Sequence, residues 1–484
     1  MGDCVPLPIK KACSLSKKRV HLRKAVKLEK SMKKTVFTVL IICLILSFSA
    51  CNRAEESSAP LSEESVPAGS AREESTPEES TPEESAPETV APSMTEEEGE
   101  RQTKPDPLPI ESTFFPDAVF LNYVKDHADS DHDGFLCKEE LEAVTEVDLF
   151  MEERLASVSG IEFFPNLVKL TCCSTGLTSL DLSNNTALEY LNCGLCHIRE
   201  IDLAGCTDLK VLHCELNELH TTDVSGLPVL EDLWCEVDDL SELDLSHNPA
   251  LRELRISGKT GQIDLSHNPE LSVLQIDPID GPDAGFLSAL NVSHNPKLFF
   301  MQLADSRLPS LDLSGNPELK TLYIISDPEL KELDVSNNPM LENLQCHGGG
   351  LTSLNISGTP LLEDLDVSCN SLTQIDLSGH PRLRSFSCAQ NRLDSLDISS
   401  CPELKSLDCS GNRLTSLDLS ENVNLGYLYA FGNSLSELRV EGIEAFRNLE
   451  ETRTEEDGID TYCREVGFDS FVTIKCDASS KVVF

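Results

Sequence analysis

Hydrophobic and polar positions recur along most of this chain with a period of about 21 residues, the length typical of a solenoid repeat. Each unit contains regularly spaced leucines and then a short phrase, which reads Leu-Asp-Leu-Ser where it first occurs at 180–183. The second residue of that phrase returns in unit after unit, as Asp181, Asp202, Asp223, Asp244, Asp264, Asn291, Asp312, Asp334, Asn355, Asp376, Asp397 and Asp418. We call this set the Asp column. A repeat this regular predicts stacked coils, in which each coil covers the apolar face of its neighbour.

Equivalent positions in successive units form further columns, and three of these predict the interior. One column holds only aliphatic residues and cysteines, so cysteine there behaves as a small buried hydrophobe; its cysteines are Cys172, Cys193, Cys214, Cys235, Cys346, Cys388 and Cys409. Two columns rich in asparagine are expected to satisfy backbone groups inside the turns: one holds Cys196, Asn217, Asn370, Asn391, Asn412 and Asn433, the other Asn185, Cys206, Asn248, Asn268, Asn295 and Cys401. A disulfide framework or a zinc site in the repeats is the alternative. Beyond the repeats, Cys463 and Cys476 are the best candidates for a disulfide.

Two polar columns are assigned to the turns. The carboxylates of the Asp column are expected to accept hydrogen bonds from turn amides or to face water, because stacked carboxylates repel one another. A calcium-bridged ladder of these carboxylates is the alternative. His247, His267 and His294 share a column with glycines and asparagines, which indicates a turn position with positive φ. A metal site formed by these histidines is the second interpretation.

The unit itself carries a family resemblance. Residues 188–198 read Leu-x-x-Leu-x-Cys-x-x-Cys-x-Ile, and Ile-Asp-Leu follows at 201–203. With a 21-residue period, this resembles the bacterial leucine-rich-repeat surface proteins of the IRREKO type. The resemblance implies a repeat solenoid over residues 161–440: a leucine-rich-repeat arc, mostly β, with a parallel β-sheet on its concave face and turns outside.

In such an arc, the concave face would be built from the three outward positions of each strand segment, which are 190, 192 and 194 in the unit that follows Asp181. The chain's only tryptophan and four of its six tyrosines fall at these three positions or their equivalents. Exposed aromatic residues gathered on one face are typical of a recognition site. The candidate ligand-binding residues are Tyr190, His213, Trp234, Arg255, Phe300, Gln302, Tyr323, Tyr427 and Tyr429. An expanded unit around 277–286 offers a loop over this face. The alternative is that some of these aromatic side chains only fill gaps, or pack under a C-terminal cap.

A calcium-binding loop of the EF-hand type is predicted before the repeats. A helical pattern over 115–127 is followed by acidic residues at every ligand-bearing spacing of the twelve-residue loop, with Gly134 at the sharp turn. The candidate ligands are the side chains of Asp129, Asp131, Asp133 and Glu140 and the carbonyl of Phe135. Cys137 departs from the pattern at a position that is usually polar. Because dockerin modules carry two such loops, a single loop favours a structural Ca²⁺ in a small helical N-terminal cap at 113–160. A solvated acidic turn is the alternative.

The segments on either side of this cap and solenoid have distinct compositions. Met-Lys-Lys at 32–34, an apolar run at 36–48 and small residues before Cys51 predict a secretory signal at 32–51, with residues 1–31 as an erroneous extension. The small residues followed by cysteine resemble a bacterial lipobox and imply lipidation of Cys51, although Phe48 departs from that pattern; an ordinary secreted protein is the alternative. Residues 52–112, rich in Glu, Ser, Pro and Thr, predict a disordered linker. At the other end, residues 441–484 lose the period and predict a capping segment, with strands at 471–474 and 482–484.

Charge and missing motifs narrow the function. The chain carries a formal charge of −44, and residues 1–51 alone carry +9, so the rest carries −53. This argues against nucleic acid or an anionic membrane as a partner. No arrangement typical of nucleophilic, phosphate-binding or zinc-dependent catalysis occurs, so we expect no enzyme.

We expect a monomer on the bacterial cell surface, outside the cytoplasm, held to the membrane only by its lipid. It is expected to bind an extracellular protein or glycan through the concave face. A structural spacer and a calcium-dependent carbohydrate-associated module are the alternatives.

Overall fold

The structure of this protein is a computed structural model, and it describes residues 107–219, 222–278, 287–447, 449–450, 453–456, 458–467 and 470–484. The predicted extension at 1–31, the signal segment with Cys51, nearly all of the linker at 52–112 and most of the expanded unit (279–286) lie outside the described residues. Among the residues that are described, no helix has the length and apolar character needed to cross a bilayer.

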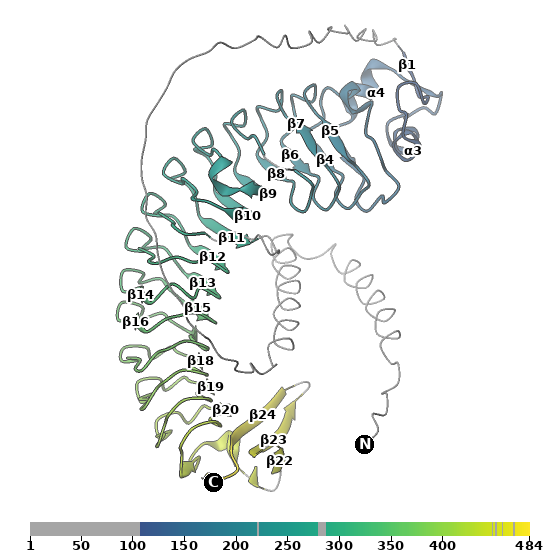
Figure 1. Ribbon diagram of the computed structural model, residues 1–484. Helices are drawn as coiled ribbons and strands as arrows, with labels where there is room; N and C mark the ends of the chain where they lie inside the picture. The colour runs from purple at the N-terminus through teal and green to yellow at the C-terminus, as the bar shows by residue number, and fades with distance from the viewer. Residues whose placement is uncertain are drawn as a thin grey trace, which may run out of the picture. The chain divides into compact units, whose positions relative to one another are not determined.

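The repeats form a β-solenoid of about 13 turns, as predicted. Each turn contributes one strand to a single parallel sheet on the inner side of the curved solenoid (Figure 1). In order, the strands are β3 (Glu146–Asp148), β4 (Lys169–Thr171), β6 (Tyr190–Asn192), β8 (Val211–His213), β9 (Asp232–Asp239), β10 (Glu253–Thr260), β11 (Val273–Pro278), β12 (Phe300–Ala304), β13 (Thr321–Ile325), β15 (Asn343–His347), β17 (Asp364–Asp366), β18 (Ser385–Ser387), β19 (Ser406–Asp408) and β20 (Tyr427–Tyr429). Equivalent repeat positions are paired throughout, so the repeat period sets the register.

The outer side consists mainly of turns, with a few short parallel pairs. Strand β5 (Ser179–Asp181) pairs with β7 (Glu200–Asp202), and β14 (Glu332–Asp334) pairs with β16 (Ser353–Asn355). Short 3-10 turns occur at Ile161–Phe163, Leu240–Glu242 and Glu444–Phe446. Between the inner sheet and these turns lies one continuous core of leucine, isoleucine, valine and cysteine side chains.

The cysteine column lies in that core, as predicted. Cys172, Cys193, Cys214 and Cys235 stack in four consecutive coils with no exposed surface, and all described cysteines are free thiols. Burial raises the pKa of the Cys235 thiol to about 12, so it stays protonated and behaves as an apolar group.

Both asparagine columns bond the coils together, as predicted. The Asn412 side chain donates from Nδ2 to the Cys388 carbonyl at 2.9 Å and to the Cys409 carbonyl at 3.0 Å, and its Oδ1 accepts from the Leu393 amide at 3.0 Å. In the other column, Asn248 Nδ2 donates to two carbonyls of the preceding coil at 2.9 and 2.8 Å. These bonds satisfy backbone groups that would otherwise be buried without partners.

The Asp column caps the outer turns, also as predicted. Asp223 Oδ1, for example, accepts from the backbone amide of Ser225 at 2.9 Å and from its hydroxyl at 2.7 Å. The Ser225 hydroxyl, followed by the amide, lowers the pKa of this carboxyl, so it remains ionised.

The positive-φ interpretation of the histidine column is wrong. His247, His267 and His294 are not among the described residues with positive φ. Close backbone approach explains one glycine of this column, since a Cβ at Gly205 would lie 2.2 Å from the Ser183 carbonyl oxygen of the preceding coil. Gly379 has a positive φ, of 87°. Most left-handed residues of the repeats lie in a different column, just after an inner strand.

Both ends of the solenoid are covered. At the N-terminus, α3 (Ala118–His127) and α4 (Lys138–Ala143) flank the acidic loop, and β1 (Leu108–Pro109) pairs with β2 (Phe135–Leu136) inside that loop. At the C-terminus, β24 (Ser470–Asp477) continues the inner sheet beside β20 and pairs with β23 (Ile459–Gly467), which in turn pairs with β22 (Thr454–Glu456). Strand β25 (Lys481–Val483) pairs with β21 (Glu437–Arg439) on the outer side.

The suggested Cys463–Cys476 disulfide is absent. In the β23–β24 pair, Cys463 lies opposite Thr473 and Cys476 lies opposite Asp460, three residues away. An odd offset places the two side chains on opposite faces of the sheet, and accordingly Cys463 is exposed while Cys476 is buried.

Candidate calcium loop and concave-face cluster

The acidic loop connects two short helices that pack on the first coil. Asp117 caps α3 by accepting from the Val119 and Phe120 amides at 2.8 and 3.1 Å. Gly134 has a φ of +84°, which lets the loop turn sharply. Strand β1 fixes the far side of the loop, and the Ile110 amide donates to the Gly134 carbonyl at 3.0 Å.

The three aspartates converge as the spacing predicts. Oxygen atoms of Asp129, Asp131 and Asp133 lie within 4.8 Å of one another. Asp129 is only 5% exposed, and its two oxygens accept from the Asp133 and Gly134 amides at 3.2 and 3.1 Å. Backbone donors therefore hold these carboxylates in place, although like charges so close together repel. A hard cation that takes oxygen ligands would remove that repulsion.

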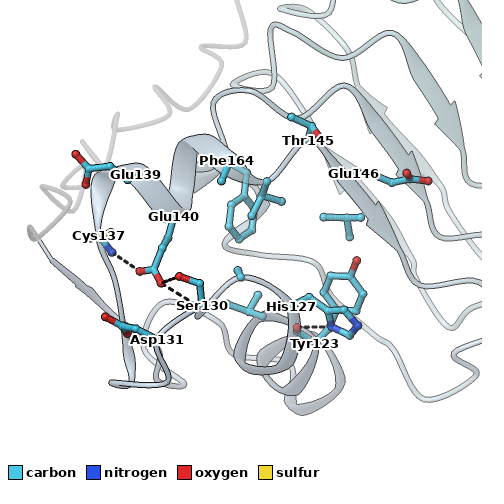
Figure 2. Close-up of a pocket in the computed structure, with 15 residues that line it drawn as sticks. Tyr123, His127, Ser130, Asp131, Cys137, Glu139, Glu140, Thr145, Glu146 and Phe164 are labelled. Carbon is cyan, nitrogen blue, oxygen red and sulfur yellow. Dashed lines mark hydrogen bonds between the residues drawn. The ribbon is translucent and has the colours of Figure 1, made fainter.

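Glu140 closes the loop from α4 and is nearly buried. Its Oε1 accepts from the amide and the hydroxyl of Ser130, both at 2.7 Å, and its Oε2 accepts from the Cys137 amide at 3.0 Å (Figure 2). The Ser130 hydroxyl is the main cause that lowers the pKa of Glu140 to about 2, against the opposing effect of burial. Glu140 thus stays ionised and contributes oxygens at the same loop. The three converging aspartates are oxygen donors of the kind that Ca²⁺ takes, and the two other candidate ligands, Glu140 and the Phe135 carbonyl, lie in the same loop.

A cavity of about 480 Å³ separates this loop from the first strand of the solenoid (Figure 2). Its walls come from α3, α4 and β3, and include the stacked rings of Tyr123 and His127, whose centroids are 4.2 Å apart. The Tyr123 hydroxyl accepts from the Asp148 amide at 3.1 Å and ties α3 to β3. The loop is therefore mechanically coupled to the start of the sheet.

On the concave face, the predicted residues of four neighbouring coils form one cluster. His213, Trp234 and Arg255 occupy directly paired positions on β8, β9 and β10. The Tyr190 and His213 rings meet edge to face at 6.1 Å, and the His213 and Trp234 rings at 5.9 Å. We call Tyr190, His213, Trp234 and Arg255 the aromatic cluster.

An acidic residue organises this cluster. Asp232, on β9, lies 3.1 Å from His213 Nε2 and 3.3 Å from Arg255 Nη1. Arg255 is held on its other side by Glu253 at 2.7 Å. We did not single out Asp232 from the sequence. Its position, in the same column as Tyr190 and beside a histidine and an arginine in the adjacent coils, was the available signal.

The remaining predicted residues form two separate groups. The Phe300 and Tyr323 rings meet edge to face at 5.8 Å on β12 and β13. Gln302 beside them is only 6% exposed and donates to Asp277 at 3.2 Å, so little of it is available at the surface. Asp277 was also missed; burial raises its pKa.

The third group lies at the C-terminal end of the sheet, on β20. Tyr427 is 39% exposed, and Lys475 of the cap lies over the Tyr429 ring at 5.2 Å from its centroid. These tyrosines therefore contact the cap strand β24, as the alternative interpretation allowed, while Tyr427 still presents surface.

Comparisons with known proteins support the repeat fold. The family described as Leucine Rich repeats (2 copies) matches residues 381–422. The functional domain of InlJ from Listeria monocytogenes, described as including a cysteine ladder, is 21% identical with a TM-score of 0.55; the match covers 77% of this chain and 98% of that one. An internalin (inlF) from the same organism is 21% identical with a TM-score of 0.55, covering 66% and 97%.

A plant peptide hormone receptor, RGFR1 in complex with RGF2, is 19% identical with a TM-score of 0.51, and the match covers 62% of this chain and 53% of that one. No curated protein sequence matches this chain. At these identities the likeness establishes a leucine-rich-repeat fold, with structural similarity to bacterial internalins, and leaves function to the site.

Proposed function

We propose that this protein is a lipid-anchored bacterial surface protein that binds an extracellular protein or glycan through its concave face. Cys51 is the proposed lipidation site, and it forms the only link to the membrane. The protein acts as a monomeric binding module rather than as an enzyme. The leucine-rich-repeat fold fits this role, because such folds serve as scaffolds for interactions along an extended concave surface.

The aromatic cluster is the observation that carries the proposal. Tryptophan, tyrosine and arginine contribute most to binding energy at protein interfaces, and here all three lie within four successive coils of one sheet. Asp232 and Glu253 hold the Arg255 guanidinium before any ligand arrives. A ligand would therefore meet a preorganised surface, and less entropy would be lost on binding.

Calcium has a structural role in this proposal. Asp129, Asp131, Asp133, Phe135 and Glu140 would hold the ion, which would neutralise the acidic loop and stiffen the N-terminal cap. Through the contact between Tyr123 and β3, this cap supports the end of the sheet that carries the aromatic cluster.

Two other functions remain as alternatives. A structural surface spacer would have no use for aromatic side chains gathered on one face. A calcium-dependent carbohydrate-associated module would place the ligand near the acidic loop, where the cavity beside α4 is the only feature in its favour among the described residues.

The test is a protein and glycan array probed with the solenoid, in the presence and absence of calcium. We expect the joint variant Trp234→Ala, Phe300→Ala and Tyr323→Ala to lose its array signals at least about tenfold, because each substitution removes aromatic contact area. Met340→Ala and Val423→Ala, both exposed in outer turns, serve as controls and should bind like the native chain. Equal binding by the aromatic variant, with an unchanged melting curve, would contradict the proposal and favour the spacer.

A further inference from the structure

Large apolar side chains are exposed to solvent along one edge of the concave sheet, in the coils nearest the N-terminal cap. Phe150, Met151, Leu195 and Leu216 are between 50% and 56% exposed. Backbone bonds place Met151, Ser174, Leu195 and Leu216 in successive coils of one column, with Ser174 between Met151 and Leu195; Phe150 precedes Met151. We call Phe150, Met151, Leu195 and Leu216 the leucine ridge. Leu195 and Leu216 follow β6 and β8, the strands that carry Tyr190 and His213 of the aromatic cluster.

The backbone of the ridge is unfavourable for the residues it carries. Met151, Leu195 and Leu216 have φ values of 62°, 57° and 53°, in the left-handed region that disfavours side chains with a Cβ. Other coils place glycine or mostly small or polar residues at the same position: Ser174, Asp305, Ser326, Gly348, Cys369, Gln390, Gly411 and Gly432. Leucine at this position is unfavourable both for the left-handed backbone and for solubility. A large apolar residue that is kept there despite both costs indicates a surface that binds a partner.

A carboxylate lies next to the ridge with one oxygen unpaired. The Glu215 side chain lies over Gly194, where a Cβ would come within 2.3 Å of its Oε1. Its Oε2 is buried and has no hydrogen-bond partner among the described residues. Desolvation raises the pKa of Glu215. The basic side chains nearest to it, His213 and Arg255, are already bonded to Asp232. Because Oε2 is closed to solvent, a basic partner would be attracted by the charge of the half-buried Glu215 side chain rather than by a hydrogen bond to this oxygen.

We propose that the leucine ridge and the Glu215 carboxylate form a docking surface for a polypeptide partner that presents apolar side chains next to a lysine or arginine. The inference rests on the proposed binding function and narrows the ligand class from protein or glycan to protein. Three of the four ridge side chains have no ring on which a sugar could stack, but they pack well against the apolar side chains of a peptide. The net charge of −44 favours a basic partner as well.

The probe is a short synthetic peptide of alternating leucine and lysine, titrated into the full chain by calorimetry. Trp234 is the only tryptophan of the chain and lies in the coil next to Leu216, so its fluorescence gives a second readout. We expect the double variant Leu195→Asn and Leu216→Asn to bind the peptide about tenfold more weakly. Its melting temperature should not fall, since asparagine tolerates left-handed φ. Glu215→Gln should also weaken binding.

Controls separate this inference from general attraction and from the concave-face proposal. Val423→Asn, which alters an equally exposed side chain in an outer turn, should bind the peptide like the native chain. Native-level binding by the double variant, or equal binding of a serine–lysine peptide, would overturn the inference. Binding of the native chain to phosphatidylcholine vesicles, or self-association that the double variant abolishes, would overturn it in favour of a membrane or a second copy. If array ligands are lost by the aromatic variant but kept by the ridge variant, only the ridge assignment fails.

Discussion

At the scale of single residues, the buried asparagines link neighbouring coils. The Asn412 side chain, for example, bonds to backbone groups of its own coil and of the preceding coil. In the same column Cys196 makes only weak sulfur bonds with the preceding coil: its Sγ donates to the Cys172 carbonyl at 3.3 Å, accepts from the Thr175 amide at 3.5 Å and lies 3.2 Å from the Thr175 hydroxyl. Substitutions in this column therefore compare the contribution to stability of an asparagine amide with that of a cysteine thiol at equivalent positions.

We predict that Asn412→Ala lowers the free energy of unfolding by about 3 kcal/mol, because it leaves the Leu393 amide and two carbonyls buried without partners. Cys196→Ala should cost about 1 kcal/mol, since it removes a small apolar volume and weak sulfur hydrogen bonds. Urea unfolding followed by circular dichroism measures both values. Equal losses for the two variants would show that these side chains contribute only packing.

Repetition explains which residue roles could be predicted. A buried position of the repeat accepts only a few residue types, and the same restriction recurs in many coils. The interior cysteines, the asparagines that bond neighbouring coils and the aspartates of the outer turns were therefore all assigned correctly from their columns. The histidine column failed because glycine is selected both by positive φ and by close backbone approach, and sequence does not separate these causes. The leucine ridge was missed because leucine gives no sign of a left-handed backbone.

At the scale of elements, the acidic loop acts as a joint between two short helices and the first coil. Inside the loop, β2 pairs with β1, a strand that lies before α3 in the sequence. This pairing could not be predicted, because Leu108 and Pro109 follow the long polar segment and carry no strand pattern. The extra length of β9 and β10, whose strands the repeat did predict, and the cap strand β23 could not be predicted either, because polar residues interrupt the alternation of apolar and polar positions that is typical of a strand.

Calcium should stabilise this end of the molecule first. We predict that chelation by EDTA speeds amide hydrogen exchange in residues 118–143 while exchange near β18 and β19 stays unchanged, because a bound ion stabilises only the state that binds it. Asp131→Asn with Glu140→Gln should abolish the calcium effect, and Glu152→Gln, an exposed acid outside the loop, should retain it. Exchange that ignores both calcium and EDTA would contradict the metal assignment.

At the scale of the whole molecule, parallel stacking turns distance along the sequence into adjacency in space. Tyr190 and Trp234 are separated by two coils of chain, yet both contact His213. The period predicted that these residues share a face, and the structure adds what the period could not: three separate groups, the ion pairs of Asp232, and the unpaired oxygen of Glu215. Side-chain contacts between coils depend on side-chain rotamers and on the local curvature of the solenoid, and a repeat pattern in the sequence determines neither.

The most direct test of this account is a nuclear Overhauser measurement between tryptophan and histidine rings, in deuterated protein with only these two residue types protonated. The single indole of Trp234 should give a cross-peak to one imidazole, because the Trp234 and His213 ring centroids lie 5.9 Å apart. The His213→Gln variant should remove that cross-peak. Absence of the cross-peak in the native protein, or its persistence in the variant, would contradict the register on which the concave-face cluster depends.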